Sequence, residues 1–83
     1  KIPVELGELL RLQELDLSKN QLEGTIPAVL GNLTELSKMY LADNRYLTGY
    51  IPSSLGLLTK LTGLNLAGNF LIGECVQKTK THP

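Results

Sequence analysis

The strongest constraint on this 83-residue chain is a pattern of leucines and one asparagine that recurs three times. The first copy starts at Leu12 and reads LxxLxLxxNxL, and similar copies start at Leu36 and Leu61. An Ile-Pro pair recurs with the copies, at residues 2–3, 26–27 and 51–52, which gives a period of about 24 residues. A fixed period of this size predicts a solenoid, in which each repeat buries its apolar face against its neighbours.

Within each copy, apolar residues alternate with variable ones, as in a strand with one buried face. The pairs Leu15 and Leu17, Met39 and Leu41, and Leu64 and Leu66 are predicted to point inward. Equivalent strands should stack as a parallel sheet, and their crossovers should be right-handed. The outward positions should then form three rows across the sheet: Glu14-Lys38-Gly63, Asp16-Tyr40-Asn65 and Ser18-Ala42-Ala67.

The asparagines of the pattern, Asn20, Asn44 and Asn69, each follow a strand where the chain must turn. An Asn amide carries two donors and one acceptor oxygen, so it can bond backbone groups that the turn leaves unpaired. We therefore predict a structural ladder of stacked asparagines. Positive φ is expected at Gly24, Gly49 and Gly73, and a short 3₁₀ or α turn that stops at a glycine is expected over 27–31 and 52–56.

The second half of the pattern, Leu22-x-Gly24-x-Ile26-Pro27-x-x-Leu30-Gly31-x-Leu33, resembles plant-type extracellular leucine-rich repeat proteins. This class includes the ectodomains of receptor-like kinases, receptor-like proteins and polygalacturonase-inhibitor proteins. The resemblance spans residues 2–73. It implies an α/β right-handed solenoid with a parallel β-sheet on the concave face and 3₁₀ or α turns on the convex side. It also implies a second short strand near residues 25–26 and 50–51, and ligand or co-receptor binding at the cell surface.

Two departures from the pattern set the expected boundaries. The second copy has one extra residue after Asn44, so Arg45 or Tyr46 should bulge outward. The third copy replaces Ile-Pro by Cys75-Val76 and leads into a polar stretch. We predict a repeat array over residues 1–76 and a disordered, non-capping tail over 77–83. Because the sequence begins in mid-repeat, we also expect it to be a segment of a longer solenoid.

Composition and spacing argue against several other classes of function. Formal net charge is zero and aromatic residues are few, which does not fit nucleic-acid binding. A single cysteine excludes an internal disulfide and a zinc site built on cysteine pairs, and no apolar run reaches the ~18 residues of a membrane span. Glu14 and Asp16 could share a cation, but a solvated face beside Lys38 explains them equally well. Cys75 and His82 lack an oriented geometry for nucleophilic catalysis. We therefore expect no enzyme activity, metal or cofactor.

Binding is better supported, because solenoids use their concave sheet as an extended contact surface. Tyrosine and arginine often anchor interfaces, which directs attention to Tyr40, Arg45, Tyr46 and Phe70, predicted to lie along one margin. Tyr50, on the expected lateral strand, is a weaker candidate, and every solenoid must in any case expose some residue at its variable positions. The predicted partner-binding residues are Glu14, Asp16, Lys38, Tyr40, Arg45, Tyr46, Asn65 and Phe70.

Residues 32–34, Asn-Leu-Thr, form an N-glycosylation sequon, so Asn32 is a candidate glycosylation site if the protein is secreted. The leading hypothesis is a non-catalytic recognition module of a cell-surface receptor or inhibitor, which binds a protein or peptide ligand and, as a further partner, a co-receptor. The alternatives are an ectodomain piece of a receptor kinase and an intracellular structural repeat protein. With about three repeats and apolar ends, we expect marginal folding or self-association of the isolated chain.

Overall fold

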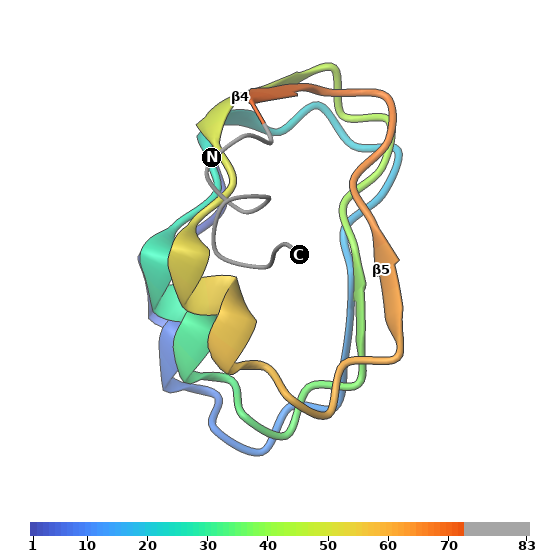
Figure 1. Ribbon diagram of the computed structural model, residues 1–83. Coiled ribbons are helices and arrows are strands. Elements are labelled where there is room, and N and C mark those ends of the chain that lie inside the picture. Colours follow the sequence, from blue (N-terminus) through green and yellow to red (C-terminus); the bar gives the residue numbers. More distant parts are fainter. Residues whose placement is uncertain (73–83) are drawn as a thin grey trace.

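The structure of the chain, a computed structural model, describes residues 1–72. Three coils follow one another, and each passes through a 3₁₀ turn and two strands (Figure 1). Viewed along the stack, one sheet lies on the right, a second at the top, and the 3₁₀ turns on the left. The elements in chain order are η1 (Val4–Glu8), β1 (Glu14–Asp16), β2 (Glu23–Thr25), η2 (Ala28–Asn32), β3 (Lys38–Tyr40), β4 (Tyr46–Tyr50), η3 (Ser53–Leu57), β5 (Gly63–Asn65) and β6 (Phe70–Ile72).

The predicted solenoid with parallel strands is confirmed. Strands β1, β3 and β5 form sheet A, in the order in which they occur in the chain. Leu15 pairs with Met39 and Met39 with Leu64, so equivalent positions of the repeat lie side by side without any offset. The 3₁₀ turns occupy the opposite side of each coil (Figure 1). The predicted end of the array at residue 76, the polar tail over 77–83, Gly73 and the Cys75–His82 pair lie outside the described residues.

Strands β2, β4 and β6 form sheet B, which is also parallel. A second strand in each coil was expected near residues 25–26 and 50–51. The observed strands begin and end earlier in the sequence than predicted, since β2 ends at Thr25 and β4 ends at Tyr50. Gly24 pairs with Leu47, and Gly49 pairs with Leu71. Sheet B is therefore staggered by two residues per coil relative to the sequence pattern, whereas sheet A is in register.

The core lies inside the middle coil, which is packed on both sides. Leu30, Leu33, Leu36, Met39, Leu41 and Leu47 have no exposed surface. The predicted burial of Leu64 and Leu66 is wrong: Leu64 is 52% exposed and Leu66 is half-buried, because within residues 1–72 sheet A covers β5 on one side only. Leu17, in the first coil, is also only half-buried.

Ala42, in contrast, is more buried than predicted. It was expected on the exposed face, but it is 6% exposed. Its backbone N–H donates to Ser18 Oγ at 3.1 Å, and its carbonyl accepts from the Lys19 N–H at 2.8 Å. These bonds hold the small side chain close to the preceding coil.

The 3₁₀ turns begin after a proline, which is in the extended conformation at Pro3, Pro27 and Pro52. The predicted role of glycine as the stop is wrong, because η2 and η3 each continue one residue beyond their glycine. A Cβ at Gly31 would come within 2.6 Å of the Ser54 carbonyl oxygen. Glycine is needed here because the turns of adjacent coils touch, not because the helix ends.

The asparagine side chains link the coils through backbone groups. Asn44, which is fully buried, donates from Nδ2 to the carbonyls of Leu17 (3.1 Å) and Leu41 (2.9 Å). Its Oδ1 accepts from the N–H groups of Asn20 (3.1 Å) and Leu22 (3.2 Å). Asn69 repeats the arrangement one coil later, since its Oδ1 accepts from the N–H groups of Asn44 and Arg45.

Positive φ angles mark the turns on both sides of the asparagines. Gly24 (86°) and Gly49 (81°) have the positive φ that was predicted. The residue before each asparagine is also left-handed: Lys19 (59°), Asp43 (60°) and Gly68 (72°). Arg45 (73°) is the extra residue of the second repeat, and it bulges within the turn that leads into β4.

No helix among the described residues is long and apolar enough to cross a membrane.

Candidate functional site

The outer face of sheet A carries side chains from β1, β3 and β5. The strand register places Glu14, Lys38 and Gly63 in one row, and Asp16, Tyr40 and Asn65 in the next. These rows are the ones that the sequence predicts. The structure thus brings together five of the predicted binding residues on one face: Glu14, Asp16, Lys38, Tyr40 and Asn65.

Tyr40 is the largest side chain of this face and is half-buried. It reaches along the sheet to Gly63 of the next strand, where an added Cβ would lie 2.6 Å from its Oη and 3.3 Å from two ring carbons. Gly63 therefore provides the space in which the ring rests. In the sequence, the only sign of this contact is that Gly63 occupies an outward position in the strand that follows the strand of Tyr40. The amino-acid composition does not reveal it.

Polar side chains on both sides of Tyr40 are held by local hydrogen bonds. Asp16 Oδ1 accepts from the Ser18 N–H at 3.0 Å, and Asn65 Oδ1 accepts from the Ala67 N–H at 3.0 Å. Both residues are exposed, and each side chain carries a second polar atom beside the one that is bonded. The face can therefore offer a carboxylate and an amide to a ligand on either side of an aromatic ring.

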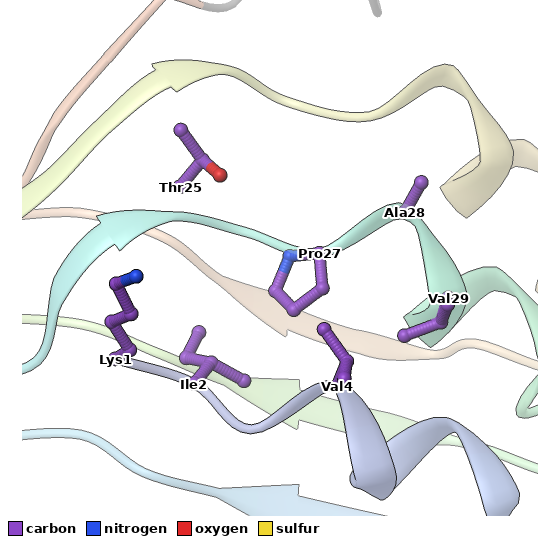
Figure 2. A pocket seen from close by; sticks show the side chains of 7 residues that line it. All are labelled: Lys1, Ile2, Val4, Thr25, Pro27, Ala28 and Val29. Carbon is purple, nitrogen blue, oxygen red and sulfur yellow. The ribbon is translucent and has the colours of Figure 1, made fainter.

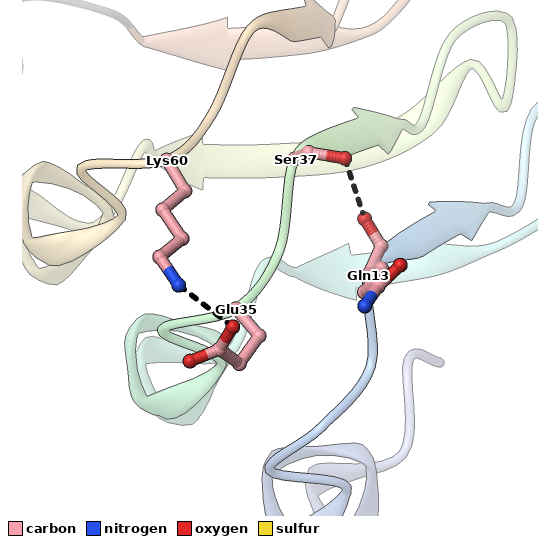
Figure 3. A network of polar contacts seen from close by, with 4 residues as sticks. All are labelled: Gln13, Glu35, Ser37 and Lys60. Atoms are coloured by element: carbon pink, nitrogen blue, oxygen red, sulfur yellow. Dashed lines mark hydrogen bonds and ion pairs between the residues drawn. The ribbon is translucent and has the colours of Figure 1, made fainter.

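Electrostatic contacts near this face are sparse. Glu14 and Lys38 are neighbours by register, but the salt bridge found within residues 1–72 joins Lys60 Nζ to Glu35 Oε1 at 2.8 Å (Figure 3). That pair is exposed and precedes the strands of sheet A, as does the bond from Ser37 Oγ to the Gln13 carbonyl at 3.1 Å (Figure 3). Glu14 is exposed, and Lys38 is half-buried.

The predicted margin that joins Tyr40 to Arg45, Tyr46 and Phe70 is wrong. Tyr40 lies on sheet A, whereas Tyr46 and Phe70 begin β4 and β6 of sheet B, beyond the asparagine turn. Arg45 lies in that turn, where its N–H donates to Asn69 Oδ1 at 2.9 Å. The prediction failed because two sheets meet at this corner and residues on opposite sides of it face different directions.

A shallow hollow lies at the other end of sheet B, between the first two coils (Figure 2). It has a volume of about 340 Å³. None of the predicted site residues lines it. Among the described residues no group of three or more His, Cys, Asp or Glu side chains is arranged to hold a metal ion. The hollow is lined by Lys1, Ile2, Val4, Thr25, Pro27, Ala28 and Val29.

The sequon residue Asn32 ends the 3₁₀ turn η2, on the side of the coil opposite sheet A. Asn32 and Thr34 are both exposed, and the Thr34 N–H donates to the Asn32 carbonyl at 2.9 Å. Asn32 therefore lies at an exposed position in a short turn, away from the candidate binding face.

Solved structures of plant receptors are similar to this chain. The ectodomain of the Arabidopsis thaliana membrane receptor kinase GASSHO1/SCHENGEN3, in complex with CASPARIAN STRIP INTEGRITY FACTOR 2, is 49% identical with a TM-score of 0.83, over 86% of this chain and 8% of that chain. The plant peptide hormone receptor RGFR1, in complex with RGF2, is 46% identical with a TM-score of 0.76, over 84% and 11% of the two chains. The chain thus spans about a tenth of these receptors or less.

The sequence comparison gives the same result. Receptor-like protein 41 of Arabidopsis thaliana is 40% identical over 45 residues, which are 54% of this chain and 5% of that protein. Residues 8–71 match the profile of the family described as "Leucine rich repeat". The resemblance to plant-type extracellular repeat proteins, stated from the Ile-Pro and glycine positions, is therefore confirmed. The chain belongs to the leucine-rich repeat family.

Proposed function

We propose that this chain is a ligand-recognition segment of a plant-type receptor, which binds a protein or peptide through the outer face of sheet A. It acts through surface complementarity and carries out no catalysis. The observation that carries this proposal is the position of Tyr40, which rests against Gly63 with Asp16 and Asn65 on its two sides. Tyrosines held in this way are frequent anchors of protein interfaces.

The packing of Tyr40 favours binding for an energetic reason. A side chain that is already held in one orientation loses little conformational entropy when a partner covers it. The neighbouring polar groups add directionality, because the carboxylate of Asp16 accepts hydrogen bonds and the amide of Asn65 both donates and accepts them. A peptide that crosses the strands can therefore be bound by its backbone amides and by one side chain that covers the ring.

The similar proteins support the class of ligand. RGFR1 is described as a peptide hormone receptor, and the GASSHO1/SCHENGEN3 ectodomain was solved in complex with CASPARIAN STRIP INTEGRITY FACTOR 2. We also propose a co-receptor as a further binding partner of this recognition segment. From these similar proteins we take only the type of ligand, a secreted peptide or protein. The residues proposed to bind it are those of sheet A in this chain.

A double-mutant cycle on the Tyr40–Gly63 contact tests this function. Peptides are selected from a displayed random library on the wild-type chain, and their affinities are measured for Tyr40→Ala, Gly63→Ala and the double variant. We expect each single change to weaken binding about tenfold or more, and the double change to add little, because both disturb the same ring. Leu10→Ala, at a 58% exposed position between η1 and β1, is the control and should bind normally.

Equal binding by wild type and Tyr40→Ala would contradict the assignment of sheet A. Additive losses in the double variant would show that Gly63 acts independently of the Tyr40 ring. Thermal unfolding of every variant checks that the fold is retained.

We further propose that the protein is located at the cell surface and that Asn32 is glycosylated. Its support is the exposure of Asn32 and Thr34 in a short turn on the side opposite sheet A, where a glycan leaves the binding face open. The test is the mass of the Asn32 peptide from protein secreted by plant cells, before and after enzymatic deglycosylation, with Thr34→Ala as control. An unmodified Asn32 in secreted material would exclude the glycan, and retention of the protein inside the cell would favour the intracellular alternative.

A further inference from the structure

The two ends of the coil stack leave different apolar residues exposed. We call the surface of the first coil (residues 4–25) that points away from the second coil the head face, and the surface of the third coil (residues 53–72) that points away from the second coil the tail face. Leu9 of the first coil is 49% exposed, whereas Leu33, its counterpart in the second coil, is fully buried. Leu64 of the third coil is 52% exposed, whereas its counterpart Met39 is fully buried. Each end therefore exposes a leucine whose counterpart in the middle coil is covered.

The exposed leucines of the two ends are complementary in position. Leu58, the counterpart of Leu9 in the third coil, is only 5% exposed, and Leu15, the counterpart of Leu64 in the first coil, is 7% exposed. Within residues 1–72, the position of Leu9 is thus covered by a preceding coil and the position of Leu64 by a following coil. A tail face placed on a head face covers both leucines, whereas two like faces placed together repeat neither contact.

Backbone hydrogen bonds between the coils follow one pattern, which stops at the tail face. The Leu17 N–H donates to the Tyr40 carbonyl at 2.8 Å, and the Leu41 N–H donates to the Asn65 carbonyl at 2.9 Å. Leu66 holds the same position in the third coil, and its N–H has no acceptor among residues 1–72. A strand edge with unpaired backbone groups is a template for pairing with another strand.

The asparagine ladder has the same polarity. The Asn20 N–H donates to Asn44 Oδ1 at 3.1 Å, and the Asn44 N–H donates to Asn69 Oδ1 at 3.2 Å. In the part of the chain that the structure describes, the Asn69 N–H has no acceptor and Asn20 Oδ1 accepts no hydrogen bond. The tail face therefore offers the donor, and the head face the acceptor, of one further step of the ladder.

The glycines of the 3₁₀ turns also distinguish the third coil from the others. A Cβ at Gly7 would lie 2.8 Å from Val29 Cβ, and a Cβ at Gly31 would lie 2.6 Å from the Ser54 carbonyl oxygen, so the turn of the following coil requires glycine at both positions. Gly56 is the third member of this series, yet a Cβ there would meet no atom within 4 Å. Its glycine has the same steric purpose only when another coil lies against η3.

We propose that a second copy of this chain stacks on the tail face through its own head face, so that the copies form one continuous solenoid. The contact between coils occurs twice within the chain, with the same register in sheet A, and the proposed interface repeats it. Strand β1 of the second copy then pairs in parallel with β5. The formal net charge of zero means that the copies do not repel one another as whole molecules.

The repeated contact gives a partner to each group described above. The Leu66 N–H donates to the Asp16 carbonyl of the second copy, and the Asn69 N–H donates to Oδ1 of its Asn20. The turn η1 of the second copy packs on η3 beside Gly56. Because the two faces differ, each added copy leaves a new tail face open, and association continues beyond the dimer. The outer face of sheet A stays uncovered, so this inference is independent of the function proposed for that face.

Sedimentation velocity of the 83-residue chain over a range of concentrations, with Cys75 kept reduced, tests the proposal. We expect the average mass to rise past that of a dimer. Leu9→Lys blocks the head face and Gly56→Arg blocks the tail face, so each variant alone should form no chain of copies. An equimolar mixture of the two should form a dimer and nothing larger, because the intact tail of one variant binds the intact head of the other.

Tyr50→Ala is the control for association through exposed aromatic surface. Tyr50 is 58% exposed in the middle coil, which has a coil on each side, so stacking does not cover it and this variant should associate like the wild type. Thermal unfolding at low concentration checks that each variant keeps its fold.

Three results would overturn the proposal. A monomer at every concentration would leave the tail face without a second copy, and residues 73–83 or another protein would then be its cover. A mixture of the two blocked variants that stays monomeric would exclude head-to-tail contact. A wild-type dimer that grows no further and persists in both variants would be a symmetric contact elsewhere on the surface. Peptide binding at sheet A is measured on the blocked variants, so either proposal can fail alone.

Discussion

Asn44 is the fully buried polar residue among residues 1–72. Its side chain bonds four backbone groups on two coils and has no exposed surface, whereas Asn20, at the equivalent position one coil earlier, is exposed and bonds only carbonyls of its own coil through Nδ2. The sequence predicts the asparagines to be structural from the chemistry of the amide. It does not predict the difference between them, because that difference arises from the coils on either side.

Replacing Asn44 by alanine is expected to lower the free energy of unfolding by at least about 1–3 kcal/mol, because it leaves buried backbone donors and acceptors without partners. Asn20→Ala should cost clearly less, since water replaces the bonds of an exposed amide. Tyr40→Ala should also cost less. Urea unfolding of the three variants provides the measurement, and equal losses for Asn44 and Asn20 would refute the importance of burial.

Lys19 offers a second test at the scale of one residue. It holds φ at 59° at the position where the third coil has Gly68. The left-handed conformation costs a non-glycine residue about 1–2 kcal/mol, and the added freedom of glycine in the unfolded chain costs about 0.5–1 kcal/mol. Lys19→Gly should therefore leave stability unchanged or raise it slightly. Lys38→Gly, within β3, removes the same charge and should be destabilising; a loss at Lys19 of the same size would contradict this account.

At the scale of elements, the 3₁₀ turns show how far a repeat pattern specifies structure. The sequence predicts their position from Ile-Pro and from the glycine that follows, and each turn forms there. The role of the glycine was assigned wrongly, because the contact that requires it comes from a residue about one repeat away. The strands of sheet B also could not be predicted fully from the repeat pattern. Their two-residue stagger depends on how the coils stack, and the local sequence contains no sign of it.

A matched pair of glycine variants separates the two roles. Gly31→Ala should destabilise the protein by about 1–3 kcal/mol, the usual range for overpacking, because its Cβ would meet the Ser54 backbone within 2.6–2.9 Å. Gly56→Ala meets no atom within 4 Å and should be neutral or stabilising by up to about 1 kcal/mol. Thermal melting of both proteins compares them. If both substitutions destabilised equally, the glycines would be needed for the turn itself.

For the whole molecule, burial rises from the ends of the stack to its middle. The alternation of apolar residues in each repeat is a local property, and it correctly predicts that Leu15, Met39 and Leu41 are buried, although it fails for Ala42. The extent of burial depends on neighbours: Met39 is fully buried between β1 and β5, while Leu64, one coil later, is 52% exposed. For the same reason the sequence identifies Tyr40 as a candidate contact but does not show that Gly63 supports it.

The exposed apolar residues of the last described coil lead to a prediction about association. We expect the isolated chain to self-associate as its concentration rises, because Leu64 and its neighbours present apolar surface. Leu64→Lys should weaken this association, as measured by sedimentation velocity over a range of concentrations. Thr62→Lys, at an exposed position two residues away, adds the same charge without removing apolar surface and serves as the control. A monomer at all concentrations would refute the prediction.

The extra residue of the second repeat also bears on protein engineering. Arg45 lengthens the corner between sheets A and B by one residue, yet Tyr46–Tyr50 still pairs with both neighbouring strands with the same stagger. The additional backbone N–H is satisfied by Asn69 Oδ1 and the Gly68 carbonyl. This corner therefore absorbs a change in chain length without disturbing either sheet, which makes it the natural place to graft a loop of new specificity into a stack of otherwise uniform repeats.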